Sequence, residues 1–268
     1  MLEWNQSNIM AQPTHRYILK SATMIAPKVR HLAFMREGDL PLPFTAGQFI
    51  TLHIEGPNKI LHRSYSIANP PNIDNTIEIA CAYVEGGIST GVLFGLEPGA
   101  IISASGPHGL FVLKEERPAR YVLIATGTGV TPYRSMLNEI RHRFVKKHPE
   151  LEVIVIFGVR SPEELLFKDE FLDFAEENPG FKFYACYSRE AGDFLQPFER
   201  IGHVQSIFNE LSLDPAKDIV YLCGNPNMID DNFSSLTEMG FDKKMVRREK
   251  YLFAPRTLQP SSVSPAFS

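Results

Sequence analysis

The chain has 268 residues, a formal net charge of −4 at pH 7, 44% hydrophobic residues and 22% charged residues. This length suits two domains of ordinary size, and the composition is that of a globular protein with a full core, which excludes a largely disordered chain. The negative charge gives no support to nucleic-acid binding through a basic surface. Because no apolar run approaches the roughly 20 residues that span a bilayer, and the N-terminus lacks a signal-peptide pattern, we expect a cytoplasmic protein without membrane insertion.

The N-terminal part of the chain has the pattern of an all-β domain. Short β-branched and aromatic runs at residues 17–19, 29–34, 48–54, 64–68, 76–84 and 100–105 are separated by Gly, Pro and Asn. One helix is expected at 89–96, after two glycines. Six short strands at this spacing predict a small antiparallel β-barrel over residues 14–116, preceded by a flexible N-terminus at 1–13.

The pattern changes after a charged stretch with a proline at residues 114–118, which we interpret as a domain boundary. Apolar strands at 121–125, 151–158, 182–187 and 218–224 now alternate with expected helices at 133–147, 162–177, 203–210 and 226–239, and a last strand is expected at 245–253. Continuous apolar strands joined by helices predict a parallel sheet covered on both faces, so we expect a Rossmann-like α/β domain over residues 117–253. The Pro/Ser-rich tail, 254–268, is expected to be mobile.

The three cysteines, Cys81, Cys186 and Cys223, are widely scattered and odd in number. This spacing is not typical of a disulfide framework, a zinc site or an iron–sulfur cluster. The histidines also lack metal-like spacing, so no metal site is expected. Any electron-transfer chemistry would therefore need an organic cofactor.

Residues Arg63, Ser64, Tyr65 and Ser66 form a short extended segment that combines a cation, an aromatic ring and hydroxyls. Side chains alternate along a strand, so Arg63 and Tyr65 are expected on one face, where a guanidinium suits a phosphate and a tyrosine ring suits a flat heterocycle. An ordinary strand with a surface arginine is the alternative for these four residues alone.

Two glycine turns stand at expected helix starts. Gly127, Thr128 and Gly129 follow a buried strand, and Gly87 precedes a short segment of Ile88, Ser89 and Thr90. Such turns direct backbone N–H groups and the positive end of a helix at an anion, which predicts a phosphate site in each domain. A generic strand-to-helix turn and a merely well-capped helix are the alternatives.

Three further groups lie where strands of the second domain are expected to end. Ser188 and Arg189 suit an extra phosphate on an adenosine ribose, Cys223 and Gly224 begin a strand-to-helix segment that reaches Met228, and Glu249 shares a strand face with Tyr251. Open α/β sheets bind ligands at this edge. A solvated arginine, a buried structural cysteine and an ordinary exposed pair are the alternatives.

Taken in order, these motifs resemble those of the ferredoxin–NADP reductase superfamily, in particular its bacterial ferredoxin/flavodoxin reductases, from about Thr14 to Tyr251. The flavin motif is similar to residues 63–66, the FAD pyrophosphate motif to 87–89, and the Gly-Pro segment that closes the barrel to 106–109. The nicotinamide-side turn is similar to 127–132, the Cys-Gly-x-x-x-Met segment to 223–228, and the terminal Glu-x-aromatic to Glu249 and Tyr251.

The resemblance implies FAD and NADP(H) as cofactors. It assigns FAD to Arg63, Ser64, Tyr65, Ser66, Gly87, Ile88, Ser89, Thr90 and Tyr251, and NADP to Gly127, Thr128, Gly129, Ser188, Arg189, Arg200, Cys223, Gly224 and Met228. It makes Ser66, Cys223, Glu249 and Tyr251 the catalytic residues, with Ser66 near flavin N5 and the Tyr251 ring over the flavin face.

Two departures from the family pattern leave alternatives open. The chain continues past Tyr251, so either Tyr251 or Phe253 is the stacking ring. Where bacterial relatives often carry Arg after Gly, this chain has His203 after Gly202, although Arg200 is nearby, so the preference for NADPH over NADH stays open.

The resemblance implies hydride transfer between NADP(H) and FAD and single-electron transfer between FAD and ferredoxin or flavodoxin, by a monomer. The alternatives are a reductase component for an oxygenase, a free flavin or a ferric acceptor. An alternative from a non-enzyme class is a nucleotide-binding regulatory module without turnover.

Overall fold

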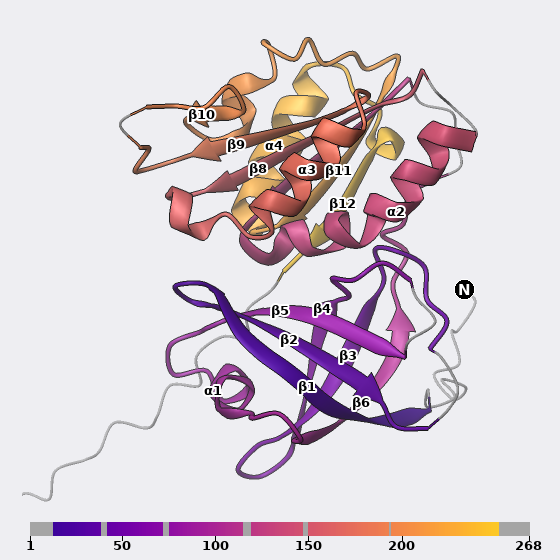
Figure 1. Cartoon of the computed structure of the whole chain (residues 1–268). Coiled ribbons are helices and arrows are strands. Elements are labelled where there is room, and N and C mark those ends of the chain that lie inside the picture. The colour runs from indigo at the N-terminus through magenta and orange to yellow at the C-terminus, as the bar shows by residue number, and fades with distance from the viewer. Residues whose placement is uncertain are drawn as a thin grey trace, which may run out of the picture.

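In a computed structural model of the chain, the residues described are 13–38, 42–71, 75–114, 119–146, 150–192 and 194–251. Two sheets, one above the other in Figure 1, divide these residues into an N-terminal and a C-terminal domain. The expected tail at 254–268, Phe253 and most of the expected boundary and flexible N-terminus lie outside the described residues.

The N-terminal domain is a six-stranded antiparallel sheet in the order β4-β3-β6-β1-β2-β5. Its strands are β1 (Thr14–Ala26), β2 (Val29–Arg36), β3 (Phe49–Glu55), β4 (Ile60–Ser66), β5 (Thr76–Ala82) and β6 (Ile101–His108), and α1 (Ile88–Gly95) follows β5. The sheet curls until its two edge strands approach, and the amide of Ala68, just after β4, donates to the carbonyl of Glu78 on β5 over 2.7 Å. The predicted antiparallel β domain is confirmed.

The core of this domain follows from the two-residue period of its strands. On β3, Ile50, Leu52 and Ile54 are buried at 1%, 0% and 1% exposure, while the residues between them face outward in part. β1 extends on both sides of the run expected at 17–19. Polar residues such as Lys20 interrupt its apolar residues, so the apolar run in the sequence is much shorter than the strand. β4 begins earlier and ends at Ser66, two residues before the expected end.

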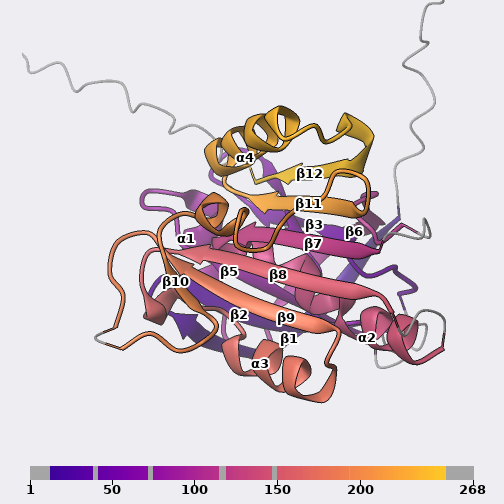
Figure 2. The ribbon, with the colours of Figure 1, turned by 90° about the horizontal axis from the view of Figure 1, so that it is seen from above.

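The C-terminal domain is a six-stranded parallel sheet in the order β10-β9-β8-β7-β11-β12, which Figure 2 shows from above. Its strands are β7 (Arg120–Thr126), β8 (Glu152–Val159), β9 (Phe181–Tyr187), β10 (Glu199–Ile201), β11 (Asp218–Gly224) and β12 (Val246–Lys250). The α-helices are α2 (Thr131–Lys146), α3 (Lys168–Glu177) and α4 (Pro226–Glu238), and the short 3₁₀ helices are η1 (Gly127–Val130), η2 (Pro162–Glu164), η3 (Val204–Ile207) and η4 (Lys243–Met245).

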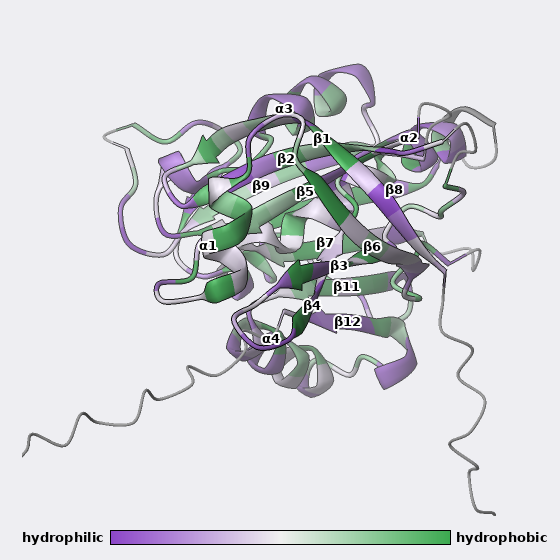
Figure 3. Cartoon of the chain, turned by 90° about the horizontal axis from the view of Figure 1, so that it is seen from below, coloured by the Kyte–Doolittle hydropathy of each residue, from purple (hydrophilic) through white to green (hydrophobic). Residues whose placement is uncertain are grey.

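Alternate residues of the central strands enter two different cores. On β7, Leu123 packs in the cluster that contains α2 and α3, while Val122 and Ile124 pack in the cluster that contains η3 and α4. Both faces of this sheet are therefore covered, as the continuous apolar strands predicted. In Figure 3, β7 and β11 are coloured as hydrophobic, whereas α3 outside them is largely hydrophilic.

Some expected elements of this domain differ in the structure. The helix expected at 162–177 is split, because Phe167 has a left-handed backbone with φ of 56° and α3 begins only after it. The helix expected at 203–210 is the 3₁₀ helix η3, and β10 was not expected at all. A three-residue strand is too short to show a hydrophobic period.

The chain that leaves the N-terminal domain is held against the second one by side chains. The Tyr121 hydroxyl donates to the carbonyl of Lys114 over 2.6 Å, the amide of Lys114 donates to the Tyr221 hydroxyl over 3.0 Å, and Arg143 on α2 donates to the same carbonyl over 2.7 Å. These bonds tie Lys114 to β7, β11 and α2 of the second domain. Among the described residues, no helix is long and apolar enough to cross a bilayer.

Candidate active site

A cleft of about 640 Å³ lies at the carboxyl ends of the parallel strands. Its lining includes residues from the ends of all six strands or the turns after them, among them Thr126, Val159, Cys186, Gly202, Gly224 and Tyr251. The chain proceeds from β7 to β8 on one side and returns to β11 on the other, so β7 and β11 flank the topological switch point. This is the position at which open α/β sheets bind ligands, and the volume is that of a small-molecule site.

Two glycines allow the turns after β7 and β11 to approach each other at this switch point. A Cβ on Gly129 would lie 2.3 Å from the carbonyl oxygen of Cys223, and a Cβ on Gly224, whose φ is +124°, would lie 2.5 Å from the carbonyl oxygen of Thr126. The amide of Asn225 donates to the Thr126 hydroxyl over 3.1 Å and ties the two turns together. The glycines thus serve close backbone packing as well as the ligand edge.

Helices begin at both turns. After the first, η1 leads into α2, with Pro132 at the second helical position where a missing N–H costs little. After the second, the Asn225 side chain caps α4 by accepting from the amides of Asn227 and Met228 over 2.9 and 3.4 Å. Both helix N-termini border the cleft, which suits an anionic pyrophosphate.

Five of the residues expected to bind NADP line this cleft: Gly127, Thr128, Ser188, Gly224 and Met228. Gly129 and Cys223 lie directly behind the lining, in the packed contact described above. Arg189 is exposed and not part of the lining. Arg200 also lies outside it, because its guanidinium forms an ion pair with Glu210 and stacks over the Tyr184 ring at 5.2 Å.

Other lining residues were missed by sequence reasoning. Arg160, at the end of β8, lines the cleft beside Ser188, and its guanidinium is paired with Glu164 four residues on. His203, which the sequence flagged only as a departure, also lines it. Arg160 follows the strand expected at 151–158 by two residues, and this position at a strand's carboxyl end was the signal that could have found it.

The strongest convergence of the predicted residues is between Ser66 and the C-terminal end of β12. The Tyr251 hydroxyl donates to Ser66 Oγ over 2.6 Å, and Ser66 Oγ donates to Glu249 Oε1 over 3.3 Å. These bonds join residues that are 185 and 183 positions apart and belong to different domains. The interface between the domains therefore carries a chain of three hydroxyl and carboxyl groups at one edge of the cleft.

The sheet itself positions Glu249 and Tyr251. Cys223 on β11 pairs in register with Glu249 on β12, and the amide of Tyr251 donates to the carbonyl of Gly224 over 2.8 Å. Burial raises the pKa of the Cys223 thiol well above its usual range, and the Glu249 carboxylate adds to the effect. Cys223 is therefore a neutral thiol behind Tyr251.

Glu249 is a carboxyl group with an unusual protonation equilibrium. Desolvation at the domain interface raises its pKa to about 7, and the hydrogen bond from Ser66 only partly opposes this. A carboxyl group with a pKa near neutrality can both hold and release a proton under physiological conditions. The same pattern is typical of functional carboxyl groups.

The expected flavin residues lie on β4 and at the start of α1. Ser64 faces outward and shares a 3.2 Å hydrogen bond with Thr51, whereas the Tyr65 hydroxyl lies on the inner side, 3.7 Å from the Cys81 sulfur. Arg63 is partly exposed and contacts the carbonyl of His62. Because side chains alternate along β4, Ser66 shares the outward face of Ser64, and at the end of the strand this face meets the second domain.

The start of α1 has the features of an anion site. Gly87 is the N-cap residue and no side chain caps the helix, so the hydroxyls of Ser89 and Thr90 lie within the first turn. Thr90 instead bonds to Val84 and the carbonyl of Gly87. Ser89 Oγ is buried with no hydrogen-bond partner, and a buried hydroxyl in a helix's first turn fits a phosphate oxygen.

Comparisons with known proteins cover both domains. Residues 16–113 match the oxidoreductase FAD-binding domain family, and residues 123–232 match the oxidoreductase NAD-binding domain family. A "Ferredoxin--NADP reductase B" of Sorangium cellulosum (strain So ce56) is 33% identical over 248 residues, which cover 91% of this chain and 99% of that protein.

Solved structures share the fold. A crystal structure of the Amycolatopsis cytochrome P450 reductase GcoB matches with a TM-score of 0.78 at 29% identity, covering 90% of this chain and 71% of that one. A ferredoxin NADP⁺ reductase from Neisseria gonorrhoeae with bound FAD and NADP matches with a TM-score of 0.75 at 24% identity, covering 88% and 98%.

Proposed function

The chain belongs to the ferredoxin–NADP reductase superfamily of FAD- and NAD(P)-binding oxidoreductases, and we propose that it is a ferredoxin/flavodoxin–NADP⁺ reductase. The observation that carries the proposal is the hydrogen-bonded cluster of Ser66, Glu249 and Tyr251, which joins the two domains beside the cleft. The similarity to a ferredoxin–NADP reductase over nearly its whole length supports the same activity.

When bound, FAD supplies the chemistry of accepting a hydride from the nicotinamide and releasing electrons one at a time. The chain's residues bind and orient the two nucleotides. The first turn of α1, where the Ser89 hydroxyl has no protein partner, would hold the FAD pyrophosphate, and the turns after β7 and β11, which border the cleft, would hold the nicotinamide dinucleotide. Arg63 and Tyr65 complete the flavin side.

At the domain interface, Ser66 directs its proton toward Glu249 Oε1, while the Tyr251 hydroxyl directs its own toward Ser66. Desolvation raises the pKa of Glu249 to about 7, so this carboxyl group can take up or release a proton near neutral pH while its Oε1 accepts the hydrogen bond from Ser66. Tyr251 lines the cleft, and at this position its ring would exclude water from Ser66 and Cys223 and would have to move for nicotinamide to take its place.

NADPH is the proposed dinucleotide. Arg160 and Ser188 both line the cleft, and a guanidinium and a hydroxyl suit an extra phosphate on the adenosine ribose, although Arg160 would first have to leave Glu164. Arg189, which the resemblance assigned to this role, and Arg200, its nearby substitute, remain predictions, and Arg200 would first have to leave Glu210.

A second candidate is a reductase component that serves an oxygenase, favoured by the likeness to the cytochrome P450 reductase, of which this chain spans 71%.

Steady-state assays distinguish the proposed function from this second candidate. FAD-loaded protein is supplied with NADPH or NADH and with ferricyanide, ferredoxin or flavodoxin as acceptor. Efficient NADPH-dependent reduction of ferredoxin or flavodoxin supports the proposal. Activity with ferricyanide but with neither carrier refutes it, and no NADPH oxidation with any acceptor leaves the non-catalytic nucleotide-binding module.

A further inference from the structure

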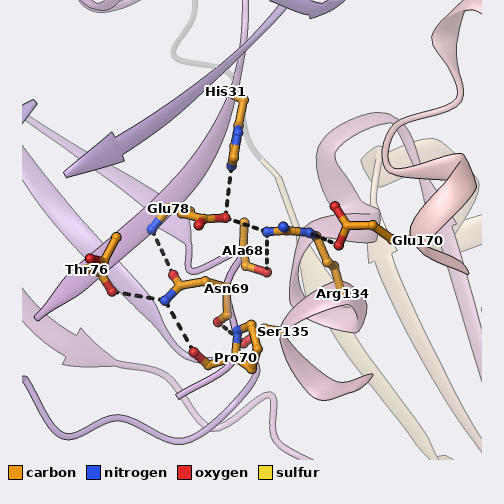
Figure 4. Close-up of polar contacts among 9 residues, drawn as sticks. All are labelled: His31, Ala68, Asn69, Pro70, Thr76, Glu78, Arg134, Ser135 and Glu170. Atoms are coloured by element: carbon orange, nitrogen blue, oxygen red, sulfur yellow. Dashed lines mark hydrogen bonds and ion pairs between the residues drawn. The ribbon is translucent and has the colours of Figure 1, made fainter. Parts of the chain in front are cut away.

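Two residues in the first turns of α2 reach from the C-terminal domain into the N-terminal domain. Arg134 Nη1 donates to Glu78 Oε2 on β5 over 2.6 Å and lies 3.2 Å from the carbonyl oxygen of Ala68. The next residue, Ser135, is fully buried and donates through Oγ to the carbonyl of Asn69 over 2.8 Å. Figure 4 shows these contacts converging from the two domains.

The Arg134 guanidinium is held on several sides. Its Nε donates to Glu170 Oε2 on α3 over 2.7 Å, and the group lies 4.6 Å from the centre of the Phe167 ring. The Arg134 side chain is only 14% exposed, so these ion pairs are shielded from solvent more than surface pairs are. A planar guanidinium with two carboxylates in fixed directions has one favoured orientation.

The groups that receive Arg134 and Ser135 are themselves fixed. Glu78 also contacts His31 Nε2 at 3.2 Å, and its backbone amide donates to the Asn69 side chain over 2.8 Å. The Asn69 amide nitrogen donates back to the carbonyl of Thr76 over 2.9 Å. The hydrogen bond of Glu78 with His31, with help from Arg134, lowers the Glu78 pKa to about 2, so its carboxylate stays charged at neutral pH.

The contacts also lie between the two halves of the candidate site. Arg134 and Ser135 come directly after the turn of Gly127–Val130 and the first residues of α2, which border the nucleotide cleft. Ala68 and Asn69 come two and three residues after Ser66. Thus α2 connects the dinucleotide turn, Gly127–Val130, to the segment that follows Ser66 in the other domain. Arg134 and Ser135 come four and five residues after this turn, and their partners come two and three residues after Ser66.

We infer that Arg134 and Ser135 are positioning residues, which set the distance and angle between the dinucleotide turn and the segment that carries Ser66. This inference rests on the proposed function, because it concerns the alignment of nicotinamide with flavin. Neither side chain contacts the cleft, so the inference predicts that their loss slows transfer within the complex without weakening nucleotide binding. Misalignment by about 1 Å can slow a reaction about a hundredfold.

Arg134→Met, Ser135→Ala and the conservative Arg134→Lys test this inference, with Arg141→Met as the matched control. Arg141 lies two turns further along α2 and pairs with Glu177 on α3 of the same domain, with an exposed side chain. The first measurement is the single-turnover rate of flavin reduction by saturating NADPH, together with the NADPH dissociation constant. We expect Arg134→Met to slow flavin reduction about ten- to a hundredfold with a dissociation constant within about twofold of wild type. Arg134→Lys should recover part of the rate.

The second measurement needs no nucleotide. Spin labels at Lys59→Cys and Glu176→Cys, both exposed and in different domains, report the interdomain distance in FAD-loaded protein, because the three native cysteines are buried. Arg134→Met should broaden the distance distribution, whereas Arg141→Met should leave it narrow.

A flavin reduction rate for Arg134→Met and Ser135→Ala that matches Arg141→Met, or an unchanged distance distribution, overturns the inference. If Arg134→Met fails to fold, Ser135→Ala and Glu78→Gln carry the same test from smaller changes. If wild-type flavin is not reduced by NADPH, the proposed function fails instead, and the distance measurement still decides whether these residues orient the domains.

Discussion

Glu249 gives a prediction whose size follows from the structure. Its pKa is raised from 4.5 to about 7, mainly by desolvation, so the folded protein binds a proton there more tightly than the unfolded chain does. Between these two pKa values the folded state holds more protons, and the free energy of unfolding therefore falls as the pH rises. A shift of this size corresponds to at most about 3 kcal/mol. The free-energy cost of ionising Glu249 in the folded protein is absent below pH 4.5 and fully present above pH 7.

Glu249→Gln keeps the shape of the side chain but removes the ionisation. We expect the stability of this variant relative to wild type to rise between pH 5 and pH 8 by about 2–3 kcal/mol, allowing for the partial exposure of Glu249. Chemical denaturation of the FAD-free protein at several pH values measures this difference. Glu176→Gln, an exposed change on α3, is the control and should run parallel to wild type. If the free energy of unfolding of Glu249→Gln changes with pH in parallel with that of wild type, the reasoning is refuted.

Three further predictions concern the cleft and its glycines. Gly129→Ala should destabilise the protein by about 2–3 kcal/mol in urea unfolding, because its Cβ meets the backbone of Cys223, whereas Gly95→Ala in α1 meets nothing within 4 Å and should not. Arg160→Ala should raise the KM for NADPH about ten- to a hundredfold with little change for NADH, and equal effects on both would exclude a 2′-phosphate contact. Ser89→Ala should weaken FAD binding, measured by fluorescence titration, because it removes the one buried hydroxyl that has no protein partner at the start of α1; unchanged affinity would contradict that role.

Parts of the fold with strong local patterns could be predicted from the sequence. The apolar runs of β7, β8 and β11 have no polar alternation, and this identifies a sheet buried on both sides. β10 and the late start of α3 could not be predicted, since one is three residues long and the other depends on the left-handed backbone of Phe167.

The site divides in the same way. The convergence of Ser66, Glu249 and Tyr251 was expected from motif order, and the structure brings these three together. Their catalytic roles remain predictions, and Phe253, the other candidate ring, lies outside the described residues. Arg134 could not be found from the sequence, because an arginine on an amphipathic helix is ordinary until the opposite domain supplies Glu78 and Ala68. Arg200 is the opposite case. Its position in the sequence suggested a phosphate ligand, but in the structure its guanidinium forms an ion pair with Glu210.

The central claim is that the interface at Ser66 is where NADPH reduces FAD bound to this chain. Anaerobic stopped-flow mixing of FAD-loaded protein with NADPH tests it directly, with wild type compared with Ser66→Ala. The account predicts that wild-type flavin absorbance bleaches rapidly and that Ser66→Ala, while retaining FAD, bleaches at least about tenfold more slowly. A protein that binds no FAD, or a Ser66→Ala variant that bleaches as fast as wild type, would contradict it.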